Sequence, residues 1–139
     1  MIVLDTNVLS ELTRRMPEPA VLSWLDEMPA EEICTTAVTA AELMYGVSRL
    51  PSGRRRTALL HAVDDLLNDD LGGRVEPFDF DAAAHYAVVV SDRDRLGRPI
   101  SVANAQIAAI CRAHGHSLAT RNIKDFVGTE VTVINPWEG

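Results

Sequence analysis

Short apolar runs rich in β-branched residues alternate with amphipathic helical segments along this 139-residue chain. The strand-like runs are 1–5, 32–38, 74–78, 117–120 and 131–135. Helical segments separate most of them, which favours right-handed crossovers between parallel strands, with helices on both faces of the sheet. The pattern predicts an α/β fold, a three-layer α/β/α sandwich with a mostly parallel sheet of about five strands.

Helix starts are indicated by Thr39, by Asp79 or Asp81, and by Ser101, because these residue types favour the N-cap position. A further helix is expected from 54 to 71, ended by two glycines. The apolar spacing in the segments 39–48 and 54–71 predicts these core-facing residues: Leu43, Met44, Val47, Leu59, Leu60, Val63, Leu66 and Leu67.

Composition indicates one domain, residues 1–139, with no linker, repeat or low-complexity tract. The chain has 20 acidic and 13 basic residues, which is not the usual footprint of a nucleic-acid-binding protein. Local arginines are candidates for contacts with a phosphate backbone, although solvated helix surface is the favoured explanation for any one cluster. These arginines are Arg14 and Arg15, Arg54 to Arg56, and Arg93, Arg95 and Arg98.

The chain shows no signal peptide, because its N-terminal apolar run ends at Asp5. No stretch approaches the ~18 apolar residues of a membrane span. Cys34 and Cys111 stand apart in apolar segments, and we expect buried, reduced thiols. These features favour a cytoplasmic protein.

Four polar residues lie where an expected strand ends and the next element begins: Asp5, Glu42, Asn104 and Asn122. The carboxyl ends of parallel strands share one edge of the sheet, where ligands bind. Carboxylate and amide oxygens suit Mg²⁺ or Mn²⁺. The sequence therefore predicts metal-assisted phosphodiester chemistry, with Asp5, Glu42 and Asn104 as metal ligands and Asn122 as a further catalytic-site residue.

Each of these residues also has a structural explanation. Asp5 is a good N-cap for the first helix. Thr39 to Glu42 matches a capping box, in which Glu42 would bond the cap residue instead of a ligand. Asn104 could lock a helix to a strand, and Asn122 suits a turn.

Other chemistries find less support. The chain has no nucleophile elbow, phosphate-binding Walker loop or dinucleotide fingerprint. His114 and His116 flank Gly115 at an expected helix end, where the helix dipole favours histidine. A zinc site there would lack further ligands.

Four segments together resemble PIN-domain proteins, and most closely the VapC type of bacterial toxin in its FitB-like branch. They are IVLDTNVLSE, TTAVTAAELMYGV, ISVANAQIAAI and LATRNIKDFVGTEVTVINPW, in that order. The resemblance implies a Mg²⁺- or Mn²⁺-dependent ribonuclease with an α/β/α sandwich. It also implies a homodimer silenced by a VapB-type antitoxin, in an assembly that binds operator DNA.

Position by position, Asp5 and Glu42 match the first two acids of the family. Asn104 falls where the third acid is usually Asp, and Asn122 falls where many members have a fourth. Loss of an anionic ligand at 104 should weaken metal binding. Two explanations stay open: an engineered Asp→Asn substitution, or a natural member with reduced activity.

The sequence thus favours the toxin of a type II toxin–antitoxin system, a metal-dependent endoribonuclease weakened by Asn104. The alternative is a catalytically inactive PIN-fold protein that binds antitoxin or RNA. A phosphatase with an aspartyl-phosphate intermediate is weaker, because such enzymes need a second Asp where Asn7 stands.

Overall fold

A computed structural model, which describes residues 1–138, contains a sheet of five parallel strands in the order β3-β2-β1-β4-β5. The strands are β1 (Ile2–Leu4), β2 (Ile33–Thr36), β3 (Val75–Glu76), β4 (Ser117–Ala119) and β5 (Val133–Ile134). The mostly parallel five-stranded sheet expected from the sequence is confirmed.

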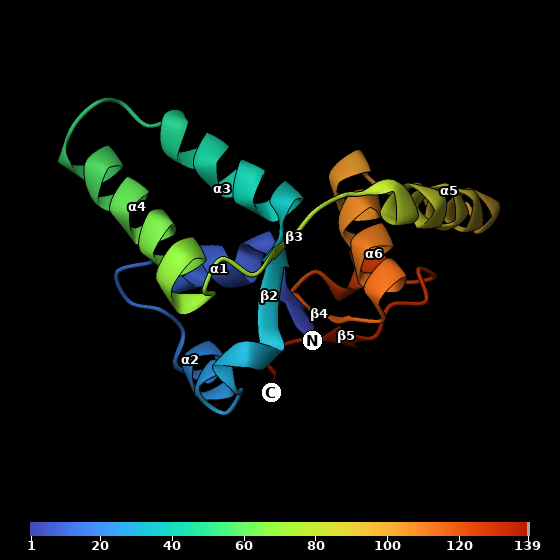
Figure 1. Cartoon of the computed structure of the whole chain (residues 1–139), viewed down its shortest axis with the longest axis horizontal. Helices are drawn as coiled ribbons and strands as arrows, with labels where there is room; N and C mark the ends of the chain where they lie inside the picture. The colour runs from blue at the N-terminus through green and yellow to red at the C-terminus, as the bar shows by residue number, and fades with distance from the viewer. Residues whose placement is uncertain (139) are drawn as a thin grey trace.

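Helices cover both faces of the sheet (Figure 1). One layer contains α1 (Thr6–Leu12), α2 (Pro19–Asp26), α3 (Ala37–Ser48) and α4 (Arg54–Asp65). The other contains α5 (Phe80–Arg95) and α6 (Val102–His114). Short helical turns are η1 (Ala30–Glu32), η2 (Leu66–Asp70) and η3 (Ile123–Phe126).

Alternate strand residues face the two layers, as strand geometry requires. Leu4 and Ile33 belong to the core of the α1–α4 side, whereas Val3 and Cys34 belong to the core of the α5–α6 side. This arrangement is the α/β/α sandwich that the sequence predicts.

The strand order reverses between β1 and β4. From β1 the chain builds outward through β2 and β3, then returns to place β4 on the other side of β1. The backbone N–H of Asp5 donates to the Ala119 carbonyl over 3.0 Å, so these two strand ends stay together. Such a reversal opens a crevice at the carboxyl edge, where ligands of α/β proteins bind.

The start of α3 differs from the prediction. Thr36 is the N-cap, and its hydroxyl accepts from the Thr39 N–H over 3.1 Å, so the helix begins at Ala37. Thr39 is therefore inside the helix, and Glu42 lies in its second turn. The predicted capping box is wrong, which leaves the Glu42 carboxylate free for other contacts.

Two predicted core residues are also wrong, because Met44 and Leu60 are 55% and 53% exposed. The helix expected from 54 to 71 is regular only to Asp65. The chain continues as the π-helical turn η2, in which the Leu71 N–H donates to the Leu66 carbonyl over 2.9 Å. Asp79, not Asp81, caps α5, while Ser101 caps α6 as predicted.

Arg93 is buried, so the predicted group of Arg93, Arg95 and Arg98 cannot act together on a phosphate backbone. Its guanidinium donates to backbone carbonyls on two segments beside the end of α5. The acceptors are Arg98 and Asp125, both at 2.6 Å, Val127 at 3.0 Å and Pro99 at 3.4 Å. Arg93 is thus a structural residue that ties η3 to the chain before α6.

Within residues 1–138, no helix combines the length and apolar character needed to cross a membrane.

Candidate active site

A pocket of about 460 Å³ opens at the carboxyl edge of the sheet. All four residues predicted for the site line it: Asp5, Glu42, Asn104 and Asn122. They come from the end of β1, from α3, from the first turn of α6 and from the segment after β4. The other lining residues are Thr6, Asn7, Ser10, Glu11, Arg14, Arg121 and Trp137.

Asp5 is the buried acid of this pocket, with 4% of its surface exposed. Its Oδ1 accepts from the Thr6 N–H at 2.8 Å, so it caps α1 as the structural explanation proposed. Its Oδ2 accepts from the Thr120 hydroxyl at 2.8 Å and from Asn7 Nδ2 at 3.4 Å. Capping and exposure of the carboxylate to the pocket are compatible here.

Burial raises the pKa of Asp5 above its ordinary value, because a charge removed from water is disfavoured. The hydrogen bonds from Thr120 and Thr6 oppose this effect, and the negative charge of Asp125 adds to it. A bound cation would favour the ionised form strongly. The site therefore holds a carboxylate whose charge state depends on what binds beside it.

Glu42 reaches the pocket from α3, and Thr6 holds it there. The Thr6 hydroxyl donates to Glu42 Oε1 over 3.1 Å and lies 3.4 Å from the hydroxyl of Thr39. Since the Thr6 N–H also bonds Asp5, one residue positions both acids through its backbone and its side chain.

Asn104 and Asn122 bring amides to the same pocket. Asn104 is partly buried, and its backbone N–H donates to the cap residue Ser101 at 3.2 Å. Within residues 1–138 its side chain makes no hydrogen bond, so the amide oxygen is available to a ligand. Asn122 is exposed, and its N–H donates to Thr120 Oγ1 at 3.1 Å.

An ion pair between the buried Glu11 and the exposed side chain of Arg14 forms one wall of the pocket. Glu11 is 5% exposed and accepts from Arg14 at 3.0 and 3.1 Å and from the Glu18 N–H at 2.9 Å. The hydrogen bond from Glu18 is the main reason that the pKa of Glu11 lies below its ordinary value. Its oxygens are occupied, so Glu11 orients Arg14 and is a poorer metal ligand than Glu42.

Arg121 lies at the rim, with its guanidinium carbon 5.1 Å from the centroid of the Trp137 ring. Stacking on the ring fixes the cation without neutralising it. Its backbone N–H donates to Asn7 Oδ1 at 3.1 Å, which ties the rim to α1. This arrangement presents a positive charge beside the acidic pocket.

A larger cleft of about 1200 Å³ lies next to this pocket. Arg14 lines both, and Arg15, Arg54 and Arg55 line the cleft together with apolar residues of α4. The structure thus brings together two arginine groups that are separate in the sequence.

The oxygen donors fit a hard divalent cation. Mg²⁺ keeps several waters and is commonly held by one or two carboxylates together with substrate phosphate oxygens. Asp5 and Glu42 supply two carboxylates on one pocket, and Asn104 supplies a neutral oxygen. No cysteine or histidine lines the pocket, which disfavours a zinc-type donor set at this position.

Glu11 and Trp137 line the site although no sequence motif pointed to them. Glu11 lies one turn after Asn7 on the pocket side of α1, so helical spacing could have placed it. Trp137 comes from the segment after β5, and no spacing rule connects it to the first helix. Thr6 and Thr120 are close in sequence to the predicted residues Asp5 and Asn122. Their hydrogen bonds to Asp5 and Glu42 were not expected.

The chain is similar to known proteins over almost its whole length. Residues 2–127 match the PIN domain. A VapC ribonuclease from Sinorhizobium fredii is 42% identical over 99% of both chains. The toxin FitB from Neisseria gonorrhoeae is 38% identical, again over 99% of both chains.

A solved structure of FitAB bound to a DNA fragment superposes with a TM-score of 0.92 at 37% identity, and covers 99% of this chain and 96% of the other. A crystal structure of FitAcB from Neisseria gonorrhoeae also gives a TM-score of 0.92, with all of both chains covered. The resemblance seen in the sequence and the fold of the structure both agree with these matches. The chain therefore belongs to the PIN-domain family, and its similar relatives are VapC ribonucleases and the FitB toxin.

Proposed function

We propose that this chain is the toxin of a type II toxin–antitoxin system and acts as a metal-dependent endoribonuclease. The observation that carries the proposal is the meeting of Asp5 and Glu42 on one pocket, where Thr6 bonds both. Relatives named as VapC ribonucleases and as the toxin FitB support the activity and the biological class.

PIN-domain nucleases generally depend on divalent metal ions. Asp5, Glu42 and the oxygen of Asn104 would hold Mg²⁺ or Mn²⁺ in this chain. When bound, such an ion lowers the pKa of a coordinated water and offsets negative charge on the phosphoryl oxygens. Asn122 would complete the polar wall of the pocket.

The residues of the chain then have separate tasks. Thr6, Thr120 and Asn7 orient Asp5, and Thr6 also orients Glu42. Fixed carboxylates cost no reorganisation when charge develops at the phosphorus. Arg14 and Arg121, which both line the pocket, would hold the flanking phosphates of an RNA strand.

Partners follow from the similar structures. The FitAB structure contains a toxin-family chain in a complex bound to DNA. We propose that this chain likewise forms a homodimer, binds a VapB-type antitoxin and joins an assembly on operator DNA. We place it in the cytoplasm, where RNA and such an antitoxin are available, and treat residues 1–139 as one PIN domain.

The direct test is RNA cleavage by the purified chain with Mn²⁺ or Mg²⁺, with EDTA as the control. Replacing Asn104 by Asp restores an anionic donor, and we expect cleavage to rise about 10-fold or more, because cation affinity grows with ligand charge. Gln106→Glu adds the same charge on α6 without lining the pocket, and it should not increase cleavage. Equal rates in the Asn104→Asp and parent chains would contradict the metal assignment.

A second function is favoured by one observation: two of the four site positions carry amides, Asn104 and Asn122. In that case the chain is an inactive PIN-fold protein that binds antitoxin or RNA. It would bind RNA without turnover, and the Asn104→Asp variant would remain unable to cut.

A further inference from the structure

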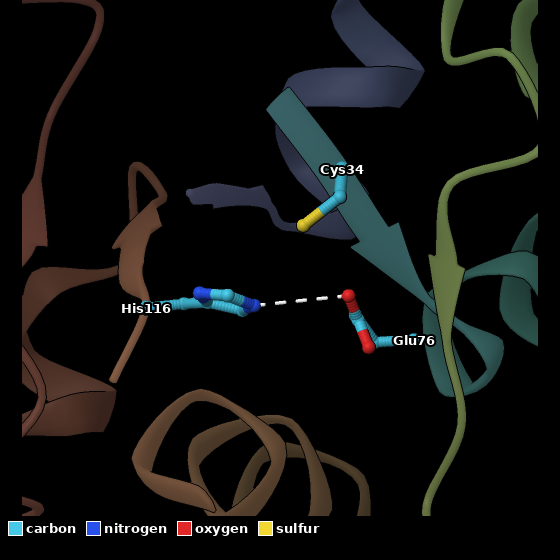
Figure 2. Close-up of side chains that lie close together, drawn as sticks. All are labelled: Cys34, Glu76 and His116. Atoms are coloured by element: carbon cyan, nitrogen blue, oxygen red, sulfur yellow. Dashed lines mark ion pairs between the residues drawn. The ribbon is translucent and has the colours of Figure 1, made fainter. Parts of the chain in front are cut away.

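A cysteine, a glutamate and a histidine from distant parts of the sequence meet on the α5–α6 side of the sheet (Figure 2). Cys34 lies on β2, Glu76 ends β3, and His116 directly precedes β4. One possible ligand atom from each residue lies within 4.8 Å of the other two. His116 Nε2 is 3.7 Å from Glu76 Oε1, and Figure 2 shows the Cys34 sulfur directed toward the same space.

This cluster is separate from the pocket that contains Asp5 and Glu42. None of its three residues lines that pocket. Asn104 stands in the first turn of α6 and His114 at its last residue, so about 15 Å of helix axis separates them at 1.5 Å per residue. The cluster belongs to the His114 end of α6, and the candidate active site belongs to the Asn104 end.

The cluster is also more than a hydrogen-bonded pair. The 3.7 Å approach of His116 to Glu76 is longer than a hydrogen bond, and His114 Nε2 lies 3.7 Å from the other oxygen of Glu76. Cys34 makes only a weak contact from Sγ to the Ile2 carbonyl, at 3.8 Å. All three groups therefore have donor capacity left for a shared partner.

We propose that Cys34, Glu76 and His116 form a binding site for a Zn²⁺-type transition-metal ion. Thiolate, imidazole and carboxylate are the three ligand types of protein zinc sites, at about 2.0–2.3 Å from the ion. Tetrahedral ligands at those distances lie roughly 3.3–3.7 Å apart, which the His116–Glu76 pair already matches. A small rotation of the Cys34 side chain closes the set, and a water takes the fourth position.

Protonation is compatible with this assignment. Burial lowers the pKa of His116, so its imidazole is neutral and can donate a lone pair. The Met1 amine lies 3.4 Å from His116 Nδ1 and Nε2 faces Glu76. A metal at Nε2 requires the imidazole proton on Nδ1, so metal binding would displace the Met1 ammonium from that nitrogen. Burial raises the pKa of the Cys34 thiol to about 11, so metal binding would release one proton from the sulfur.

The site would cross-link three elements. An ion held by β2, β3 and the residue before β4 would connect the edge strand β3 with β4, which lies on the other side of β1. A structural metal adds its binding free energy to folding. From the sequence, a zinc site at His114 and His116 appeared to lack further ligands. That expectation was incomplete, because Cys34 and Glu76 come from strands distant in sequence.

The test is Co²⁺ binding followed by the near-ultraviolet absorption of a sulfur-to-cobalt bond, which the oxygen ligands around Asp5 cannot produce. The parent chain should show this band at one equivalent of Co²⁺, and added Zn²⁺ should abolish it. Cys34→Ser should remove the band. His116→Gln and Glu76→Gln, at less buried positions, should weaken Co²⁺ binding by more than about 100-fold, since even loss of an outer partner costs 10–100-fold.

Matched controls separate this site from non-specific binding. Cys111→Ser alters the other buried cysteine, and His61→Gln alters an exposed histidine on α4, so both should keep the band. An Asp5→Asn, Glu42→Gln chain should keep it too, which makes the result independent of the proposed nuclease. Absence of the band in the parent chain, or its persistence in Cys34→Ser, would overturn the proposal.

Discussion

The Thr120 hydroxyl donates a hydrogen bond of 2.8 Å to Asp5 Oδ2 and so joins the ends of β4 and β1 where the strand order reverses. Asn7 Nδ2 lies 2.9 Å from the same hydroxyl oxygen and 3.4 Å from Asp5 Oδ2. The contact places a buried acid and its donors at the crevice created by the topology.

Removing this donor should change the pH dependence of cleavage. Burial raises the pKa of Asp5 and the Thr120 hydrogen bond lowers it, so Thr120→Val should raise that pKa further. Metal binding requires the ionised carboxylate. As pH falls, the variant should therefore lose cleavage activity at a higher pH than the parent chain. The measurement is the acid limb of kcat/KM at a fixed Mn²⁺ concentration below saturation.

Thr120→Ser keeps the hydroxyl and should restore the parent profile. Thr129→Val is a matched control, because Thr129 is equally buried but bonds the Phe126 carbonyl away from the acids. If the acid limb of kcat/KM is unchanged in Thr120→Val, the ionisation of Asp5 does not control the rate of cleavage.

Thr6 should matter through its hydroxyl. Thr6→Val keeps the side-chain shape but removes the donor to Glu42, while the backbone bond to Asp5 remains. Hydrogen bonds to charged groups are worth about 1.5–3 kcal/mol, so kcat should fall roughly 10- to 100-fold. Single-turnover cleavage would measure this change.

Thr6→Ser is expected to retain most activity, because it keeps the donor. Thr13→Val removes a hydroxyl that bonds the Ser10 carbonyl on the same helix and should leave kcat unchanged. A Thr6→Val chain as active as the parent would mean that Glu42 is positioned by other contacts.

Arg93 should be important for stability. Arg93→Met would leave four backbone carbonyls without their donor, and an unsatisfied buried polar group costs about 1–3 kcal/mol. We expect the free energy of unfolding to fall by roughly 2–4 kcal/mol, since the exposed ends of these loops recover some bonds from water. Urea denaturation measures it.

Arg95→Met is the paired control. Arg95 has a 79% exposed side chain and a surface contact of 3.5 Å to Asp92, a class of ion pair that contributes little. Its loss should change the free energy of unfolding by less than about 0.5 kcal/mol. Equal effects of the two substitutions would contradict the structural role of Arg93.

Much of the fold could be predicted because local patterns and topology agree. Apolar runs gave the strands, and Asp5 could be placed at the sheet edge because a charged residue directly follows a buried strand. Asn104 could be placed because Ser101 is an N-cap three residues earlier. Each of these inferences depends only on the residues of one short segment.

The errors came from choices that depend on tertiary contacts. Thr36 and Thr39 are both suitable caps, and pairing of Thr36 with Glu76 at the end of β2 and β3 decides between them. Helical spacing could not show how wide the buried face is, so Met44 was assigned to the core. Burial of Arg93 depends on two loops that follow it in the sequence.

The central claim is that Asp5 and Glu42 hold one divalent ion together, and Mn²⁺ binding measured by electron paramagnetic resonance tests it most directly. The parent chain should bind Mn²⁺ at this site, and Asp5→Asn and Glu42→Gln should each weaken it at least 10-fold. The double variant should bind Mn²⁺ more weakly than either single variant, because each carboxylate contributes charge to the same ion. Unchanged Mn²⁺ affinity in either Asp5→Asn or Glu42→Gln would contradict a shared ion.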